Sequence, residues 1–243
     1  MRRLHRPALD NRTSNTLARL TAEVLPGGRY DGMSAMRWRR KPVAAFKSVR
    51  DALASMASGR QRCMYCEDSH GTDIDHFRPR AGFPTLTFHW PNLLLACAHC
   101  NSNQKRDRFP VDAAGDALLI DPTSEEPADH LALSPTTGEL LGLTAKGSTT
   151  IDIFGLNDSS APRRLRDGRR HALVEFKELL RGYNDLVDID PAEAVLRKSA
   201  MQDHPFSAVL HWIVLAAQGP NGRIVLGEAT FELVHRHRVF EWL

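Results

Sequence analysis

The sequence predicts an α+β fold in which a small cysteine-rich β region lies between helical segments. Two observations lead to this prediction. All four cysteines fall within residues 63–108 as two C-x-x-C pairs separated by 30 residues, and short alternating segments lie between the pairs. The segments before and after this stretch instead repeat apolar residues at helical spacing.

Composition excludes several classes of protein. Hydrophobic residues make up 42% of the 243 residues and charged residues 25%, which is typical of globular proteins and not of disordered or fibrous ones. No apolar run reaches the roughly 18–20 residues that span a bilayer, and no apolar segment follows the basic residues 1–3. We therefore expect a cytoplasmic protein without a membrane partner. Because the cytosol keeps thiols reduced, its cysteines are expected to bind metal.

Charge is distributed unevenly along the chain. Residues 1–62 contain fourteen lysines and arginines against four acidic residues, whereas residues 111–160 contain one against nine. This pattern predicts a basic segment that faces a polyanion and an acidic region beyond it. Two solvated surfaces of opposite charge remain the alternative.

The N-terminal segment, residues 1–62, is expected to be helical. A helix is predicted over residues 14–25, where Pro26 ends it, and a second from Pro42 through Met56. Between them lies a basic cluster at residues 37–41, in which arginines adjoin Trp38. Arginine beside an aromatic ring is a frequent combination in phosphate binding, although packing of Trp38 under the following helix is the simpler interpretation.

The central segment, residues 63–110, is expected to form a compact core. Residues 72–78 alternate in character and end at Pro79, so they predict the first strand of a hairpin, with residues 86–89 as the return strand. Residues 98–107 are polar and lack glycine and proline, which predicts a surface helix.

The remaining chain is expected to form an acidic, turn-rich connector and a helical layer. Within residues 111–160 we predict only short strands, at 118–120 and 138–143. Residues 161–243 show helical spacing over 165–183, 192–201, 206–217 and 228–243.

The paired cysteines predict a structural zinc site. Two C-x-x-C pairs provide four thiolate ligands, namely Cys63, Cys66, Cys97 and Cys100. Such sites are tetrahedral, with Zn–S distances near 2.3 Å, and leave no position open for a substrate. The alternative is four ordinary thiols. With the zinc shell filled, the nearby His70, His89 and His99 are not assigned as ligands, and His235 and His237 are expected on a solvated helix face.

Asp75 and His76 are candidates for catalysis. They combine an oxygen ligand with a group that accepts protons near neutral pH. Adjacent side chains on a strand point to opposite faces, so both can serve one site only where the strand bends. An isolated Asp-His pair is more often a surface ion pair or a helix cap. Its position between two C-x-x-C pairs, followed by Asn92 and Asn101, favours catalysis.

This arrangement resembles the HNH endonucleases, which have a ββα-metal core and, in some members, zinc knuckles. More narrowly, residues 75–80, 90–97, 100–102 and 107–110 resemble the PtuB-like HNH proteins of Septu-type and retron-linked anti-phage systems. The segments 120–131 and 154–157 add to this resemblance. The HNH motifs cover about one-fifth of the chain, and the narrower likeness extends over most of it.

The resemblance implies a role for each motif residue. His76 would be the general base that activates water, Asp75 and Asn101 would hold Mg²⁺ or Mn²⁺, and Asn92 would brace the loop. The residues expected to contact phosphate are Arg78, Lys105, Arg106, Arg108, Arg39 and Arg40. Two features depart from the family pattern: the third motif residue is Asn101, and Lys105 follows it by four residues, where many relatives have three.

The sequence therefore predicts a metal-dependent endonuclease that acts on nucleic acid, with DNA favoured over RNA. The resemblance further implies a role in anti-phage defence with an ABC-type or SMC-like ATPase as partner. The competing hypothesis is a non-catalytic zinc module that binds nucleic acid or a partner protein. A pure binding module has no reason to carry Asp75, His76 and Asn101 together.

Overall fold

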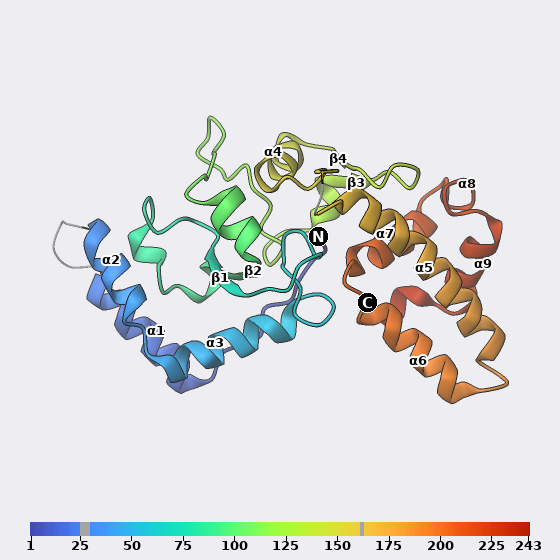
Figure 1. The fold of residues 1–243 in the computed structure, drawn as a ribbon, viewed down its shortest axis with the longest axis horizontal. Helices are drawn as coiled ribbons and strands as arrows, with labels where there is room; N and C mark the ends of the chain where they lie inside the picture. Colours follow the sequence, from blue (N-terminus) through green and yellow to red (C-terminus); the bar gives the residue numbers. More distant parts are fainter. Residues whose placement is uncertain (25–29, 161–162) are drawn as a thin grey trace.

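The computed structural model of this protein describes residues 1–24, 30–160 and 163–243. Helices α1–α3 form one end of the molecule, and helices α5–α9 form the other (Figure 1). Between them lie two small antiparallel sheets and helix α4. The predicted mixture of helices and a small β region is therefore present.

The N-terminal helices are α1 (Asn11–Val24), α2 (Tyr30–Arg39) and α3 (Val43–Met56). Helix α1 begins where Asp10 accepts hydrogen bonds from the backbone and hydroxyl of Thr13, at 2.8 and 2.7 Å. The stop predicted at Pro26 lies outside the described residues. The residues of α2 were not predicted as a helix, because their sequence carries no clear apolar face.

A two-stranded hairpin follows. Strand β1 (Asp73–His76) pairs antiparallel with β2 (Leu93–Ala96), so that Asp73 lies opposite Ala96 and His76 opposite Leu93. The return strand predicted at 86–89 is therefore wrong. Those residues belong to a loop with two short turns, η1 (Pro84–Leu86) and η2 (Trp90–Asn92).

The side chain of Asn92 explains this shift. Its Oδ1 accepts from the backbone N–H of Arg78 at 2.7 Å, and its Nδ2 donates to the carbonyl oxygens of Arg78 and Leu86. These bonds close the loop before β2 begins. All four residues of β2 are buried, which is why the strand is a continuous apolar run without alternation.

The helical segment after β2 is η3 (His99–Lys105), a π-helix. It was predicted as a surface helix, but Cys100 and Lys105 are completely buried. Helix η3 lies against α4 (Ala145–Phe154). Because Lys105 is buried, its ammonium group needs hydrogen-bond partners inside the protein.

The acidic connector contains more structure than its sequence predicted. Strand β3 (Leu131–Leu133) follows the turn η4 (Pro127–Asp129) and pairs with β4 (Leu140–Gly142), inside the predicted 138–143. The strand predicted at 118–120 is absent, and its last residue donates a backbone hydrogen bond to Thr150 of α4. Helix α4 itself was not predicted, although Thr144 caps it and Gly155 ends it at a φ of 57°.

The C-terminal layer consists of α5 (Leu165–Leu186), α6 (Pro191–Gln202), α7 (Ser207–Gln218), α8 (Gly222–Leu226) and α9 (Glu228–Arg236), and the turn η5 (Val239–Trp242). The predicted helices are present, except that the last is divided. The chain turns at Arg238, whose φ is 49°, so the predicted helix 228–243 ends near His237.

Two hydrophobic clusters hold these elements together. The first joins the N-terminal helices, the hairpin, η3 and α4, and the second joins β3 with the C-terminal helices. Leu140 of β4 packs against both. The predicted segments 1–62, 63–110 and 111–160 thus share one core, and their boundaries as separate units stay a prediction.

A buried arginine links the two clusters. Arg169 of α5 is 6% exposed, and its Nε donates to the Gly138 carbonyl at 2.7 Å. Its Nη2 donates to the carbonyl of Leu156 at 2.8 Å and to Asn157 Oδ1 at 3.1 Å. Burial lowers the pKa of this guanidinium to about 10, so it remains charged at neutral pH.

We expect Arg169→Met to destabilise the protein by roughly 2–4 kcal/mol, because two buried carbonyl oxygens lose a charged donor. Thermal or denaturant unfolding measures this change. Arg170→Met is the matched control, since Arg170 is exposed and its ion pair with Asp167 spans 3.9 Å. Equal losses in both variants would contradict the structural role of Arg169.

Candidate functional site

The four cysteines converge on one point. Their sulfur atoms all lie within 4.8 Å of one another, and all four residues are buried. Cys66 Sγ and Cys97 Sγ are 3.9 Å apart. A tetrahedral site with Zn–S bonds of 2.3 Å requires about 3.8 Å between sulfurs, whereas a disulfide requires about 2.0 Å. The cluster could therefore hold a zinc ion.

Hydrogen bonds around the cluster support metal binding. The backbone N–H of Cys100 donates to Cys97 Sγ at 3.4 Å, as expected for a C-x-x-C turn around a metal. Hydrogen bonds within the cluster lower the pKa of the Cys66 and Cys97 thiols, whereas burial raises the pKa of Cys63 and hydrogen bonds raise that of Cys100, so the four thiols do not ionise independently. A thiolate is the form that binds zinc.

The face of β1 that packs on η3 carries two acidic residues. Asp73 and Asp75 share this face because they are two residues apart. Asp75 is buried, and both of its carboxylate oxygens have partners: Lys105 Nζ donates to Oδ1 at 3.1 Å, and Tyr65 Oη donates to Oδ2 at 2.5 Å. Burial raises the pKa of Asp75, and the Lys105 charge opposes that shift.

Asn101 pairs with Asp73 instead of Asp75. Its Nδ2 donates to Asp73 Oδ2 at 3.0 Å. The amide oxygen of Asn101, which is the atom predicted to bind Mg²⁺ or Mn²⁺, is not used by this hydrogen bond. The ion site predicted at Asp75 and Asn101 therefore stays a prediction.

Lys105 does not have the environment expected of a phosphate contact. Its side chain is completely buried, and its ammonium also donates to the backbone carbonyl of His76 at 2.6 Å. In this structure the side chain cannot reach a phosphate. Lys105 instead neutralises Asp75 inside the protein, which is what allows η3 to pack against β1.

His76 lies on the opposite face of the hairpin, toward α3. Its ring contacts Trp38 edge-on at 4.4 Å between centroids, and its Nε2 is 2.9 Å from the carbonyl oxygen of Thr87. Burial, with the positive charge of Arg80, lowers the pKa of His76 to about 3. The ring is therefore neutral. Because a carbonyl oxygen only accepts, the hydrogen must sit on Nε2, which leaves the Nδ1 lone pair as the base.

A basic groove adjoins this face. It has a volume of about 400 Å³ and is lined by Arg39, Lys41, Val43, Phe46, Lys47, Arg50 and Ile74. Ile74 shares a strand face with His76. We call this surface, with its four basic and no acidic lining residues, the cationic groove. Such a lining is suited to contacts with the phosphate backbone of a nucleic acid, and not to recognition of the base edges.

The Trp38 ring contacts both His76 and two side chains that line the groove, Lys41 and Phe46. Lys41 Nζ lies 4.5 Å from the centroid of this ring, and Arg80 Cζ lies 5.5 Å from it. The Trp38 ring also contacts Phe46 edge-on. These contacts support packing of Trp38 as its role, and they hold two cations beside His76.

The other predicted phosphate contacts differ in exposure. Arg40 is exposed. Arg78 lies over the rings of Phe83 and Phe109, at 5.3 and 5.0 Å. Arg106 and Arg108 are exposed, but Arg106 donates to the Ser102 carbonyl in η3, and Arg108 donates to the carbonyls of Gln104 in η3 and Ile153 in α4. Among these arginines, Arg40 and Arg39 are the ones that lie at or near the cationic groove.

The histidines set aside in the sequence have varied surroundings. His99 contacts Gln104 at 3.1 Å, and His89 is exposed. His235 is exposed, as expected, with its Nε2 3.1 Å from the carbonyl oxygen of Ala217, whereas His237 is half-buried and contacts Asn184. No ligand group of three or more His, Cys, Asp or Glu residues is found among the described residues except the four cysteines.

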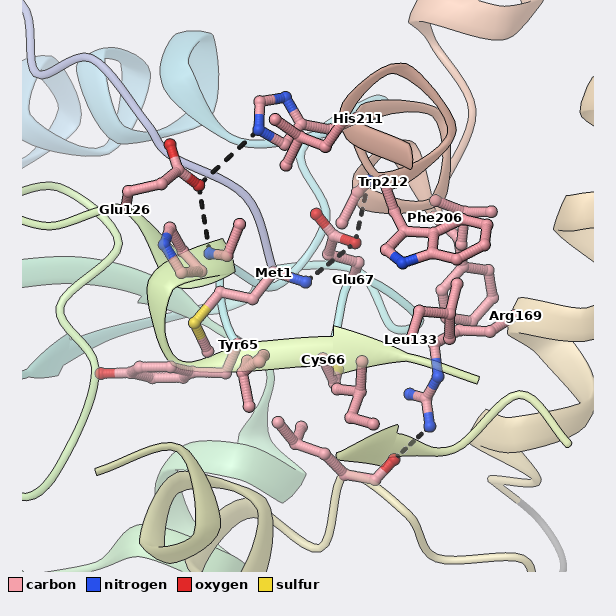
Figure 2. Close-up of a pocket in the computed structure, with 18 residues that line it drawn as sticks. Met1, Tyr65, Cys66, Glu67, Glu126, Leu133, Arg169, Phe206, His211 and Trp212 are labelled. Carbon is pink, nitrogen blue, oxygen red and sulfur yellow. Dashed lines mark hydrogen bonds and ion pairs between the residues drawn. The ribbon is translucent and has the colours of Figure 1, made fainter. Parts of the chain in front are cut away.

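A small cavity of about 50 Å³ separates the first C-x-x-C turn from the C-terminal helices (Figure 2). Glu67, next to Cys66, is buried beside it. Its carboxylate accepts from Ser58 Oγ at 3.0 Å and from the backbone N–H of Ala208 in α7 at 3.3 Å. Glu67 therefore connects the cysteine cluster to helix α7, and the cavity is too small for a substrate.

Sequence analysis missed Tyr65, Asp73 and Arg80. The spacing of Asp73 and Asp75 could have indicated a shared face, because i and i+2 on a strand point the same way. Nothing in the sequence indicated that Tyr65 would reach Asp75 from inside the first C-x-x-C turn.

Comparisons with known proteins found distant relatives. The chain is 28% identical over 159 residues to the Septu protein PtuB of Bacillus thuringiensis, which covers 63% of this chain and 54% of that protein. It is 28% identical over 148 residues to the PtuB of Bacillus mycoides strain KBAB4, covering 48% of this chain and 50% of that protein. The protein ea31 of Escherichia phage lambda is 34% identical over 84 residues, covering 34% of this chain and 27% of that protein.

The chain thus spans about half the length of the PtuB proteins that it matches. No family model matches it. In the described part of the chain, no helix has the length and apolar character needed to cross a membrane. The two PtuB matches support a relationship to Septu-type defence proteins.

We expect the purified protein to contain about one zinc per chain, because the sulfur cluster matches tetrahedral geometry. Elemental analysis measures the content. A strong chelator should lower the melting temperature, and added zinc should restore it, since metal-binding energy stabilises the fold. A protein that contains no metal, and whose melting temperature does not change when chelator is added, would contradict a structural zinc site.

Proposed function

We propose that this protein is a metal-dependent HNH-type endonuclease that cleaves nucleic acid as part of a Septu-like anti-phage system. The observation that carries the proposal is the state of His76. The Thr87 carbonyl oxygen accepts the hydrogen of Nε2, so Nδ1 is the ring atom that can take up a proton. Burial lowers the pKa of the ring to about 3, which makes Nδ1 a weaker base than that of an exposed histidine. The similarity to PtuB proteins supports the defence context.

In this proposal His76 removes the proton from the water that attacks phosphorus. The oxygen–phosphorus bond to the leaving nucleotide breaks as the new bond forms, in line with it. Arg80 and Lys41 stand beside His76 and would hold the phosphate. Asn92 would brace the loop behind β1, and the hydrogen bond that its Oδ1 accepts from the backbone of Arg78 supports this role.

Asp75 and Asn101 would hold Mg²⁺ or Mn²⁺ in the proposed enzyme. When bound, such an ion polarises the scissile phosphate and stabilises the leaving oxygen. Since Asp75 already accepts from Lys105 and Tyr65, an ion there would share the carboxylate with these two donors. Zinc has a separate, structural role in this proposal.

Nucleic acid would lie along the cationic groove. The groove lining supplies Arg39, Lys41, Lys47 and Arg50, with Arg40 exposed nearby. The Trp38 ring already packs against Lys41, Arg80 and Phe46, which favours a packing role over stacking on a base. We therefore propose contacts to phosphates, with DNA favoured over RNA, and an ABC-type or SMC-like ATPase as partner.

A specific observation favours a second candidate. His76 and Asn101 lie on opposite faces of the hairpin, and Asp75 is neutralised by Lys105. This arrangement suits a non-catalytic zinc module that binds nucleic acid or a partner protein. Cleavage assays separate the two candidates.

We expect His76→Ala to abolish Mn²⁺-dependent cleavage of plasmid or single-stranded DNA, because in this proposal His76 is the group that takes the proton from the attacking water. His89→Ala is the matched control, since His89 is exposed and has no proposed role. Both variants should fold, as circular dichroism can verify. Cleavage by His76→Ala at the wild-type rate would rule out the general base, and inactivity of the wild type with its ATPase partner would favour the binding module.

Neutralising the groove should weaken binding and flatten its dependence on salt. For the double variant Arg39→Gln, Lys47→Gln, the slope of log K against log salt should fall by about two, since each phosphate contact contributes about 0.9. Fluorescence anisotropy over a salt series measures this slope. Arg19→Gln, an exposed residue paired with Glu23 on α1, is the control. An unchanged salt slope would show that the groove does not contact phosphates and would favour another binding partner for it.

A further inference from the structure

Arg163 approaches the cysteine cluster from a distant part of the chain. It lies between α4 and α5, 63 residues beyond Cys100. Its Nη2 donates to Cys100 Sγ at 3.7 Å, and its Nη1 donates to the Phe154 carbonyl at 3.3 Å. The guanidinium therefore bridges the second C-x-x-C turn and the end of α4.

Charge explains why a cation belongs there. Four thiolates around one Zn²⁺ carry a net charge of −2, and all four cysteines are buried. A buried negative centre is stabilised by a donor that carries positive charge. Among the described lysines and arginines, Arg163 is the one whose side chain donates a hydrogen bond to a cysteine sulfur.

The protonation state of Arg163 is consistent with this. Its guanidinium is charged at neutral pH, because arginine is not deprotonated in proteins. Its Nε is buried without a protein acceptor, so the contacts to sulfur and to Phe154 hold the group in place.

We infer that Arg163 is a positioning residue of the zinc centre, which donates to the Cys100 thiolate, offsets part of the site's negative charge and thereby slows loss of the metal. The inference rests on zinc occupying the four-cysteine site. It does not depend on nuclease activity, because the cluster and the proposed catalytic residues are separate.

The position of Arg163 gives this contact a consequence for the fold. Leu165, two residues later, is fully buried and begins α5. Glu67, adjacent to Cys66, bonds the start of α7. The zinc centre is thus joined to the C-terminal helical layer at two points, so metal retention and attachment of that layer are coupled.

The test compares three variants of the full-length protein. Arg163→Met removes the charge and the donors but keeps an apolar stem of similar length. Arg163→Lys restores the charge, and Arg164→Met is the matched control, since Arg164 is exposed and pairs with Asp167. Zinc content is measured first by elemental analysis, and then zinc transfer to a chromophoric chelator is followed over time and over chelator concentration.

We expect Arg163→Met to bind zinc about 10- to 100-fold more weakly than the wild type, as is typical for loss of a group that contacts a metal ligand. Arg163→Lys should recover most of this loss, and Arg164→Met should match the wild type. If Arg163→Met fails to fold, Arg163→Gln, which keeps a donor but not the charge, takes its place: weaker zinc binding than in Arg163→Lys supports the charge contact, and binding equal to that of Arg163→Lys and Arg164→Met overturns it.

Zinc retention by Arg163→Met equal to that of both the wild type and Arg164→Met overturns the inference. Absence of zinc from the wild-type protein overturns the inference too. Elemental analysis, which is done first, detects that case, and the same result would also remove the structural zinc site from the proposed function. Loss of nuclease activity alone, with zinc retention as expected in all three variants, leaves the inference supported and counts only against the nuclease.

Discussion

The approach of the four cysteine sulfurs to one another positions the strands and turns of the hairpin and the side chains that they carry. Cys63 and Cys66 are separated from Cys97 and Cys100 by 30 residues, so their approach closes a loop that contains β1, the turns η1 and η2, and β2. Loop closure costs chain entropy, and a bound zinc offsets that cost with binding energy. Once the loop is closed, the register from Asp73–Ala96 to His76–Leu93 places each acidic or basic side chain on one face or the other.

The two faces of this hairpin have different chemistry. On the η3 face, Asp73 and Asp75 meet Asn101 and Lys105 in a buried network that Tyr65 completes. Removing one partner of such a buried ion pair typically costs roughly 3–5 kcal/mol, so this network holds η3 in place. On the α3 face, His76 stands beside Trp38 and the cationic groove, where proton transfer and phosphate binding are proposed.

Hydrogen bonds from a few charged side chains connect the hairpin and the cysteine cluster to the rest of the chain. Arg6 of the N-terminal segment donates to the carbonyls of Trp90 and Leu93 at 2.9 Å, beside the loop that Asn92 closes. Arg169 links α5 to the β4 region, and Glu67 links the first C-x-x-C turn to α7. These side chains come from segments that are remote in sequence, and each one satisfies backbone groups that would otherwise be buried without partners.

The sequence by itself determined the parts that depend on local pattern. The C-x-x-C spacing predicted a four-cysteine cluster, and apolar periodicity predicted α1, α3 and most of the C-terminal helices. Tertiary structure alone decided where β2 lies, because the side chain of Asn92 and burial on both sides select residues 93–96, not the more strand-like 86–89. It likewise decided the partners of Asp75 and Lys105, since a buried lysine and a surface lysine look the same in sequence. The pairing of Asp75 with Lys105 depends on which charged side chains come into contact when η3 packs on β1. The order of residues along the chain does not specify those contacts.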